Sequence, residues 1–175
     1  MFTLKQKVVY PGHGVAEINN IIEKKINNTV AVYYELTFLS KKATILIPVA
    51  NINTVGIRPL SNKDTVNEIL LSITRPAKRI TMKEFLATTW NRRNKNYQLK
   101  LATGDLTALS DIYKDLRFLS QTKELSFGEK TILQQVEFFL SEEIALVRSI
   151  NEEDAKKILF DYSTYSVDTL NQTSP

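Results

Sequence analysis

The sequence predicts an α+β protein of two domains, with a small β-barrel over residues 1–60 and a five-helix α domain over residues 61–165. Apolar and polar residues alternate in short runs between residues 7 and 57, which is typical of strands. After Arg58-Pro59, apolar residues recur at the spacing of a helix face. Several short strands in so short a stretch favour a barrel, because closure removes exposed sheet edges. Residues 166–175 are expected to form a polar, frayed tail.

The clearest strand signal covers residues 29–39, where five apolar side chains share one parity: Val30, Val32, Tyr34, Leu36 and Phe38. An asparagine-rich stretch just before it predicts a hairpin turn, because Asn tolerates positive φ. Residues 43–49 predict a further strand, in which Ile45 and Ile47 point inward. Leu46, of opposite parity, is therefore expected on the outer face.

Helices are predicted from apolar spacing and from start and stop residues, over 62–73, 81–103, 105–123, 126–148 and 151–162. Two of them open with a capping box, Thr81 with Glu84 and Ser126 with Glu129. Asp105 is expected to cap another, and Gly104 to end the helix before it. The pattern also allows an interruption of the second helix near Thr88-Thr89.

Composition excludes several classes of function. The chain has no cysteine, which rules out disulfides and thiolate metal sites and favours a reducing cytoplasm. Neither a signal-peptide pattern nor a run of about 18 apolar residues is found. The single histidine, His13, lies in a Gly-flanked turn, and no phosphate-binding glycine motif occurs. Glu142 and Glu143 are expected on a helix surface. We therefore predict no enzyme activity, cofactor, metal or small-molecule substrate.

The net charge of +4 hides a marked asymmetry along the chain. Residues 1–60 carry +4 (7 basic, 3 acidic), residues 61–123 carry +6 (12 basic, 6 acidic) and residues 124–175 carry −6 (4 basic, 10 acidic). Between Arg75 and Lys100 there are eight basic residues and one acid, Glu84. A concentrated positive field of this kind attracts a polyanion, although charge alone is equally typical of a solvated helix face.

Trp90, the only tryptophan, has two interpretations. On a helix it shares a face with Asn94, Tyr97 and Leu101, and this spacing by itself favours a core anchor. Its immediate neighbours are instead cationic and polar, including Arg92, Arg93 and Lys95. An aromatic wedge flanked by cations is how proteins engage a minor groove or a distorted base step, while the cations hold phosphates.

Taken together, the motifs along the chain resemble those of the CarD/CdnL transcription regulators, whose N-terminal domain is shared with transcription-repair coupling factor. The matching stretches follow the family's order: Val8-Val9-Tyr10-Pro11-Gly12-His13-Gly14, Ile45-Leu46-Ile47-Pro48-Val49, Val55-Gly56-Ile57-Arg58, Trp90-Asn91-Arg92-Arg93, Leu101-Ala102-Thr103-Gly104-Asp105-Leu106 and Leu125-Ser126-Phe127-Gly128-Glu129-Lys130. Each motif alone is weak, but their order and spacing across both domains are specific.

The resemblance implies that the barrel is Tudor-like (SH3-like) and binds the β subunit of RNA polymerase. It also implies that the helical domain contacts promoter DNA at the upstream edge of the melted bubble, where Trp90 wedges into the minor groove. The sequence departs from many members at Leu46, where an arginine often helps to hold the β subunit, and at Asn91, which replaces a serine.

We therefore expect a cytoplasmic, nucleoid-associated regulator that stabilises the open promoter complex without reading a specific base sequence. The expected DNA-binding residues are Trp90, Arg92, Arg93 and Lys95, and the expected polymerase-binding residues are Lys24, Ile26 and Leu46. Two alternatives remain open from the sequence. One is an adaptor whose barrel binds polymerase or a repair factor without productive DNA contact, and the other is an RNA-binding barrel.

Overall fold

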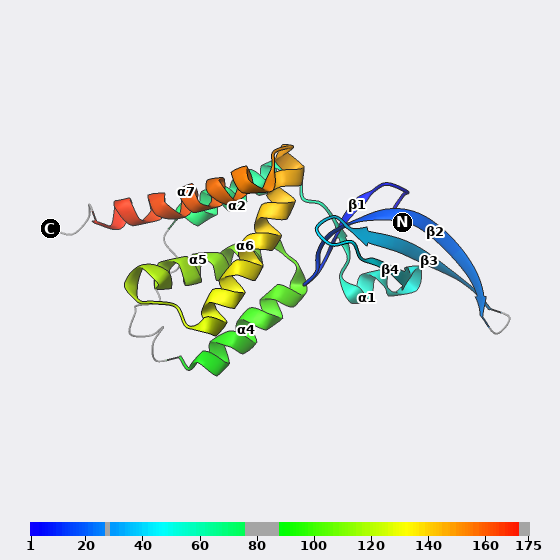
Figure 1. The fold of residues 1–175 in the computed structure, drawn as a ribbon, viewed down its shortest axis with the longest axis horizontal. Helices are drawn as coiled ribbons and strands as arrows, with labels where there is room; N and C mark the ends of the chain where they lie inside the picture. Colours follow the sequence, from blue (N-terminus) through cyan, green and yellow to red (C-terminus); the bar gives the residue numbers. More distant parts are fainter. Residues whose placement is uncertain (27–28, 76–87, 172–175) are drawn as a thin grey trace. The chain divides into compact units, whose positions relative to one another are not determined.

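The computed structural model describes residues 1–26, 29–75 and 88–171. The chain divides into two compact units, Met1–Leu60 and Ser61–Pro175. The first unit is built from strands and the second from helices (Figure 1). Each unit is described by itself.

Five antiparallel strands make up the sheet of the first unit, in the order β4-β3-β2-β1-β5. They are β1 (Lys7–Tyr10), β2 (Gly14–Ile26), β3 (Thr29–Phe38), β4 (Thr44–Pro48) and β5 (Arg58–Pro59). The turn between β1 and β2 depends on glycine, because Gly12 and Gly14 adopt φ values of 72° and 101°. A 3-10 turn (η1, Val49–Asn51) and the short helix α1 (Ile52–Val55) connect β4 to β5.

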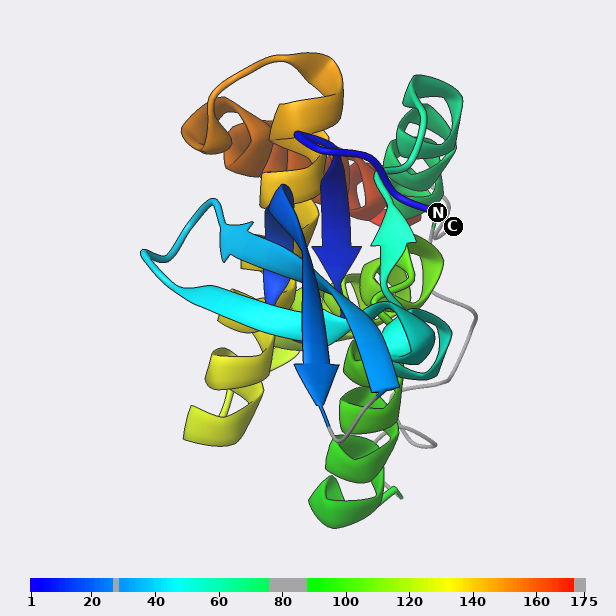
Figure 2. The same ribbon diagram turned by 90° about the vertical axis from the view of Figure 1, so that its right-hand side faces the viewer.

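The pairing leaves β4 and β5 with one partner strand each among the described residues. Figure 2 shows the strands of this unit from a second side. The predicted closure into a Tudor-like barrel is therefore not confirmed, and an α+β layout with an antiparallel sheet is what the structure supports. β5 pairs with β1 over only two residues, which is a short edge rather than a closing seam.

The core of the sheet unit lies on one face of the strands, as alternation predicts. Tyr34 and Leu36 of β3 are buried, together with Ile18 of β2. Alternation fails as a guide to burial at the far end of β3. Val30 has the same parity as the buried Tyr34 and Leu36, but it is 59% exposed. β2 and β3 extend past the other strands at this end. The side chain of Val30 therefore faces solvent, although its parity is that of the core residues.

The second unit contains α2 (Lys63–Thr74), α4 (Trp90–Thr103), α5 (Leu106–Thr122), α6 (Phe127–Arg148) and α7 (Glu152–Asn171). Residues 76–87 lie outside the described part of the chain, and with them the predicted capping box of Thr81 and Glu84. The total of five helices expected for the whole domain is therefore not confirmed. A large apolar core that contains Leu70, Ile112 and Leu140 joins the described helices, and a smaller cluster contains Leu119 and Leu125.

The predicted helix boundaries hold where capping chemistry defines them. The Asp105 carboxylate accepts from the Ala108 N–H at 2.9 Å, and Gly104 ends α4 in the left-handed conformation. The predicted capping box at the start of α6 is confirmed, with Ser126 and Glu129 bonding reciprocally.

Two expectations about the acidic C-terminal part were wrong. α7 continues to Asn171 rather than ending near Tyr162, so part of the expected polar tail is helical. The hydroxyls of Ser163 and Thr164, just beyond Tyr162, bond back to the helix, as in the 2.7 Å bond from Ser163 Oγ to the Phe160 carbonyl. Glu142 and Glu143 are buried rather than surface residues. Glu143 is stabilised there because it accepts the Ser61 backbone N–H at 2.9 Å.

Candidate functional site

Trp90 is the first residue of α4, and it is neither fully buried nor free. The indole is half-buried and packs against the core of the helical unit. Thr89, which precedes it, has an extended backbone and makes no side-chain cap. Further along the helix, Tyr97 and Leu101 are buried and anchor α4 to the same core. The side chain of Trp90 therefore contributes to the core, and its predicted contact with DNA stays a prediction.

The ring of Trp90 is seated on Gly128, the second residue of α6. A methyl group built on Gly128 would lie 2.7 Å from Cζ2 of the indole, which is closer than any real contact. Glycine is needed here for close approach and not for an unusual backbone angle, because Gly128 lies inside a helix. The glycine of the motif therefore determines where the tryptophan sits.

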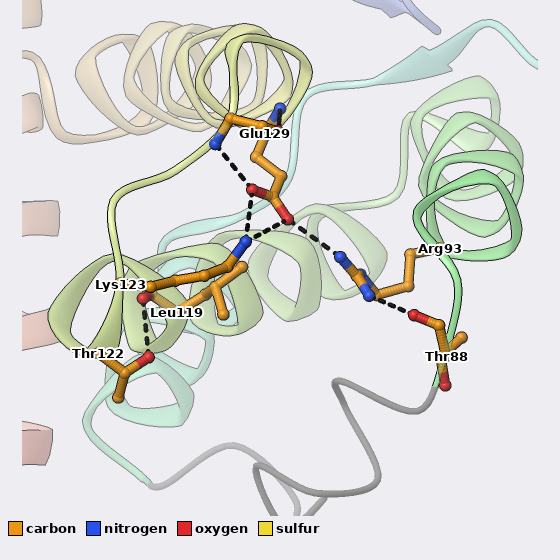
Figure 3. Close-up of polar contacts among 7 residues, drawn as sticks. Thr88, Arg93, Leu119, Thr122, Lys123 and Glu129 are labelled. Carbon is orange, nitrogen blue, oxygen red and sulfur yellow. Dashed lines mark hydrogen bonds and ion pairs between the residues drawn. The ribbon is translucent and has the colours of Figure 1, made fainter.

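A buried carboxylate joins the start of α4 to the start of α6. The side chain of Glu129 is 2% exposed, and its oxygens accept from Arg93 Nη2 at 3.0 Å and from Lys123 Nζ at 3.1 Å. The Ser126 backbone N–H donates to it at 2.9 Å. Figure 3 shows these contacts meeting at one carboxylate. A single charge-assisted cluster thus holds the start of α4 to the connection between α5 and α6, although Arg93 lies 36 positions from Glu129.

The cluster also shifts the ionisation of Glu129. Burial by itself raises the pKa of this carboxyl, but the donors outweigh burial, chiefly the Ser126 backbone and the Lys123 ammonium. The pKa of Glu129 consequently lies below its ordinary value. A carboxyl of this kind stays ionised down to acid pH and stabilises the fold while it is ionised.

Arg93 lies inside the site rather than on its outer surface. Its side chain is 12% exposed, and besides Glu129 it donates to the Thr88 carbonyl oxygen (Figure 3). Its guanidinium carbon is 6.0 Å from the centre of the Trp90 ring, within cation–π range. The predicted phosphate contact of Arg93 stays a prediction, and the geometry assigns Arg93 a positioning role toward Trp90.

Arg92 and Lys95 are exposed on the outer face of α4. Residues 90–103 contain no acidic side chain, so these two cations are not neutralised within the helix. Lys100, on the same helix, pairs with Asp111 of α5 at 3.2 Å. Of the other basic residues in this region, Arg75 is exposed, whereas Lys78, Arg79 and Lys83 lie outside the described residues.

In the sheet unit, the strand register brings the predicted polymerase-binding residues to one face. Leu46 lies opposite Glu35, and Lys24 lies opposite Ala31, both on the face that points away from the core. Leu46 is 40% exposed. Ile26 has the same parity and pairs with Thr29, although only its backbone is described.

Tyr33 was not among the predicted residues, yet it lies between Leu46 and Lys24 on this outer face. It is half-buried, and the Lys24 ammonium is 5.8 Å from the centre of its ring. The parity of Tyr33, opposite to that of the buried Tyr34, was the available signal. The outer face therefore presents an aromatic ring, a cation and a leucine.

Two further observations concern the described part of both units, namely its acidic and histidine side chains and the length of its helices. No group of three or more His, Cys, Asp or Glu side chains is arranged there to hold a metal ion. In those same residues, no helix is both long and apolar enough to cross a membrane.

Comparisons with known proteins match both units. Residues 2–61 match the CarD-like/TRCF RID domain, and residues 79–160 match the CarD C-terminal domain. The "Putative transcription factor YdeB" of Bacillus subtilis (strain 168) is 26% identical over 156 residues, which cover 89% of this chain and 98% of that protein.

These matches, in the order of the two units, define the class of protein as a transcription regulator, which is not a class of enzymes. The chain belongs to the CarD family.

The Glu129 cluster yields a pH-dependent prediction for Glu129→Gln. We expect the free energy of unfolding at pH 7 to fall by about 3 kcal/mol, because Arg93 loses its buried counter-charge. The folded-state pKa is below the unfolded value of about 4.3, so the stabilisation is complete above that pH and is lost as pH falls through the folded pKa. The difference between wild type and variant should therefore shrink below about pH 4. Urea denaturation from pH 7 to pH 3 measures it.

Glu124→Gln is the matched control, because Glu124 also pairs with a lysine, Lys130, but is fully exposed. We expect it to stay close to wild type. Asp115, whose pKa burial raises to about 6, contributes with the opposite sign, so only the difference between proteins reports on Glu129. A difference that stays constant down to pH 3 would contradict an ionised Glu129 in the cluster.

Proposed function

We propose that this protein regulates transcription initiation by binding the β subunit of RNA polymerase with its sheet unit and promoter DNA with its helical unit. On this proposal, Trp90 enters the minor groove at the upstream edge of the melted bubble. The protein acts in the cytoplasm, at the nucleoid, and it reads the shape and charge of DNA rather than a base sequence.

One observation carries the DNA-binding part of the proposal. Trp90 is only partly buried at a helix start, is supported from inside by Gly128 and the Arg93–Glu129 ion pair, and has the exposed cations Arg92 and Lys95 as near neighbours on α4. A tryptophan with a purely structural role would gain more stability from complete burial. A side chain that wedges into DNA requires both a rigid seat and a free edge, because the unstacking of a base step costs energy.

The mechanism follows from differential binding. A wedge that contacts only the melted junction adds its binding free energy to the open complex and not to the closed one. A difference of about 1.4 kcal/mol raises the open-to-closed ratio about tenfold. Attachment through the sheet unit supports this step, because a tethered second site is presented at high effective concentration.

The polymerase-binding part rests on the outer face of the sheet. Lys24, Tyr33 and Leu46 form a mixed apolar and cationic patch beside β4, an edge strand. An edge strand with an exposed leucine suits pairing with a strand or patch of a protein partner. The strip formed by Lys24, Ile26 and Leu46 is thus proposed as the contact with the β subunit.

Trp90→Ala tests the wedge. We expect a loss of about 2 kcal/mol of stability, intermediate because the indole is only half-buried, together with a tenfold or greater fall in open-complex lifetime. Gly128→Ala should displace the ring without removing it, and should shorten the lifetime while the melt stays near that of wild type. Thermal melts and promoter-opening kinetics, at a temperature where every variant is folded, give both quantities.

Tyr162→Ala is the matched control, because Tyr162 is another half-buried aromatic residue packed on the same core. It should lower the melt without changing the open-complex lifetime. If Tyr162→Ala and Trp90→Ala shorten the lifetime equally, Trp90 is a core residue only. An unchanged lifetime in Trp90→Ala with polymerase binding intact would favour a protein–protein adaptor.

Electrostatic contact with phosphates predicts a specific salt dependence. Arg92→Gln and Lys95→Gln should each flatten the slope of log K against log salt by about 0.9, for every DNA sequence alike. Arg93→Gln should instead lower stability, because its guanidinium is committed to Glu129. Lys156→Gln, at an exposed lysine of α7, is the control and should leave the slope unchanged. Salt titrations of duplex binding measure the slopes, and urea denaturation measures the stability of Arg93→Gln.

The double variant Lys24→Glu, Leu46→Glu tests the polymerase contact. We expect the affinity of the full-length protein for polymerase to fall at least tenfold. Lys24→Glu reverses a charge on the strip, and Leu46→Glu places a carboxylate where binding would bury it. Leu39→Glu with Lys42→Glu makes the same changes at exposed positions in the β3–β4 loop and should bind normally. Undiminished binding by the first variant would move the contact to another surface.

A further inference from the structure

Phe127 is the one residue of the segment Leu125–Lys130 that is both large and apolar and yet has no role in holding the fold. Leu125 is buried, and Ser126 caps α6. Gly128 seats Trp90, and Glu129 binds the buried cluster. Phe127 is 87% exposed, and it belongs to none of the apolar clusters in the described residues. A phenylalanine ring left in water forgoes the stabilisation of burial, and its faces are available to a ligand.

The position of Phe127 relates it to Trp90. Phe127 is the chain neighbour of Gly128, and a methyl group on Gly128 would lie 2.7 Å from the indole. The backbone of Phe127 is therefore next to the point where α6 touches the indole of Trp90. The first residue of α4 and the first residue of α6 are thus both aromatic. Their backbones lie at the place where the two helices meet.

The exposed cations of the first two turns of α4 and the first turn of α6 favour an anion. Arg92 and Lys95 are exposed on α4, and Lys130 lies one turn from Phe127 on α6 with half of its side chain exposed. The positive end of the α6 dipole adds to the same field. Glu124, which pairs with Lys130 at 2.7 Å, is the exposed acid nearby, and the Glu129 charge is internal and already paired.

We propose that Phe127 stacks on an unpaired base at a duplex–single-strand junction, beside the step that Trp90 wedges open. The inference rests on the proposed function and deepens it, because it makes the junction with an exposed base the preferred ligand of the helical unit. A phenyl ring has no group that binds a phosphate oxygen, whereas every base has a face that stacks on an aromatic ring. The neighbouring cations then hold the phosphates on either side.

The test measures the affinity of the full-length protein for two DNAs of the same sequence, one a fork junction and one fully paired. For Phe127→Ala we expect affinity for the fork to fall about tenfold and affinity for the duplex to change less than twofold. Phe127→Tyr, which keeps the ring, should retain wild-type affinity for both. Leu71→Ala, which truncates another exposed apolar side chain of the same unit, is the matched control.

A fluorescent base analogue at the first unpaired position reports on stacking directly. Its emission should be quenched by wild type and by Phe127→Tyr, but not by Phe127→Ala. Thermal melts should show that Phe127→Ala is as stable as wild type, because the side chain that it truncates is exposed.

The remaining outcomes separate this inference from the proposed function. If Trp90→Ala loses affinity for the fork while Phe127→Ala keeps it, the stacking role is wrong and the wedge stands. Equal loss on fork and duplex would also overturn stacking, since a base face is available only at the junction. Loss of polymerase binding with DNA binding intact would assign Phe127 to a protein contact instead. If Trp90→Ala also binds the fork normally, the proposed function itself fails.

Discussion

The carboxylate of Glu129 is the point on which the organisation of the helical unit around Trp90 depends. It lies at the first turn of α6 and binds Arg93 from α4, Lys123 from the end of α5 and the backbone of Ser126. A buried charge is tolerated only when its partners are complete, so the start of α4 cannot move independently of the start of α6. The carboxylate that completes the capping box of α6 thus also makes a tertiary ion pair with α4.

This constraint explains how a half-buried tryptophan is held in one place. The indole rests on Gly128 on one side and lies near the Arg93 guanidinium, which is itself held by Glu129. A residue that must open a base step has to arrive already ordered, because ordering it on binding would consume part of the binding free energy. The ion pair therefore contributes to function without touching the DNA in the proposed mechanism.

Helix geometry explains why two neighbouring arginines have different surroundings. Arg92 and Arg93 are adjacent in sequence, but successive residues of a helix point about 100° apart. Arg92 consequently faces solvent, and Arg93 faces the Glu129 carboxylate. The same geometric rule separates Phe127, which is exposed, from Glu129, which is buried two positions later.

By itself the sequence determined the local structure: strand parity around Tyr34 and Leu46, the caps at Asp105 and Ser126, and the motifs that indicated the family. These features depend on neighbours a few positions apart, so a pattern reveals them. Only the tertiary structure decided that Arg93 pairs with Glu129, 36 positions away, because a sequence does not say which distant charge will be buried beside it. For the same reason, only the packing of α4 against α6 decided that Trp90 is half-buried, with one side on Gly128.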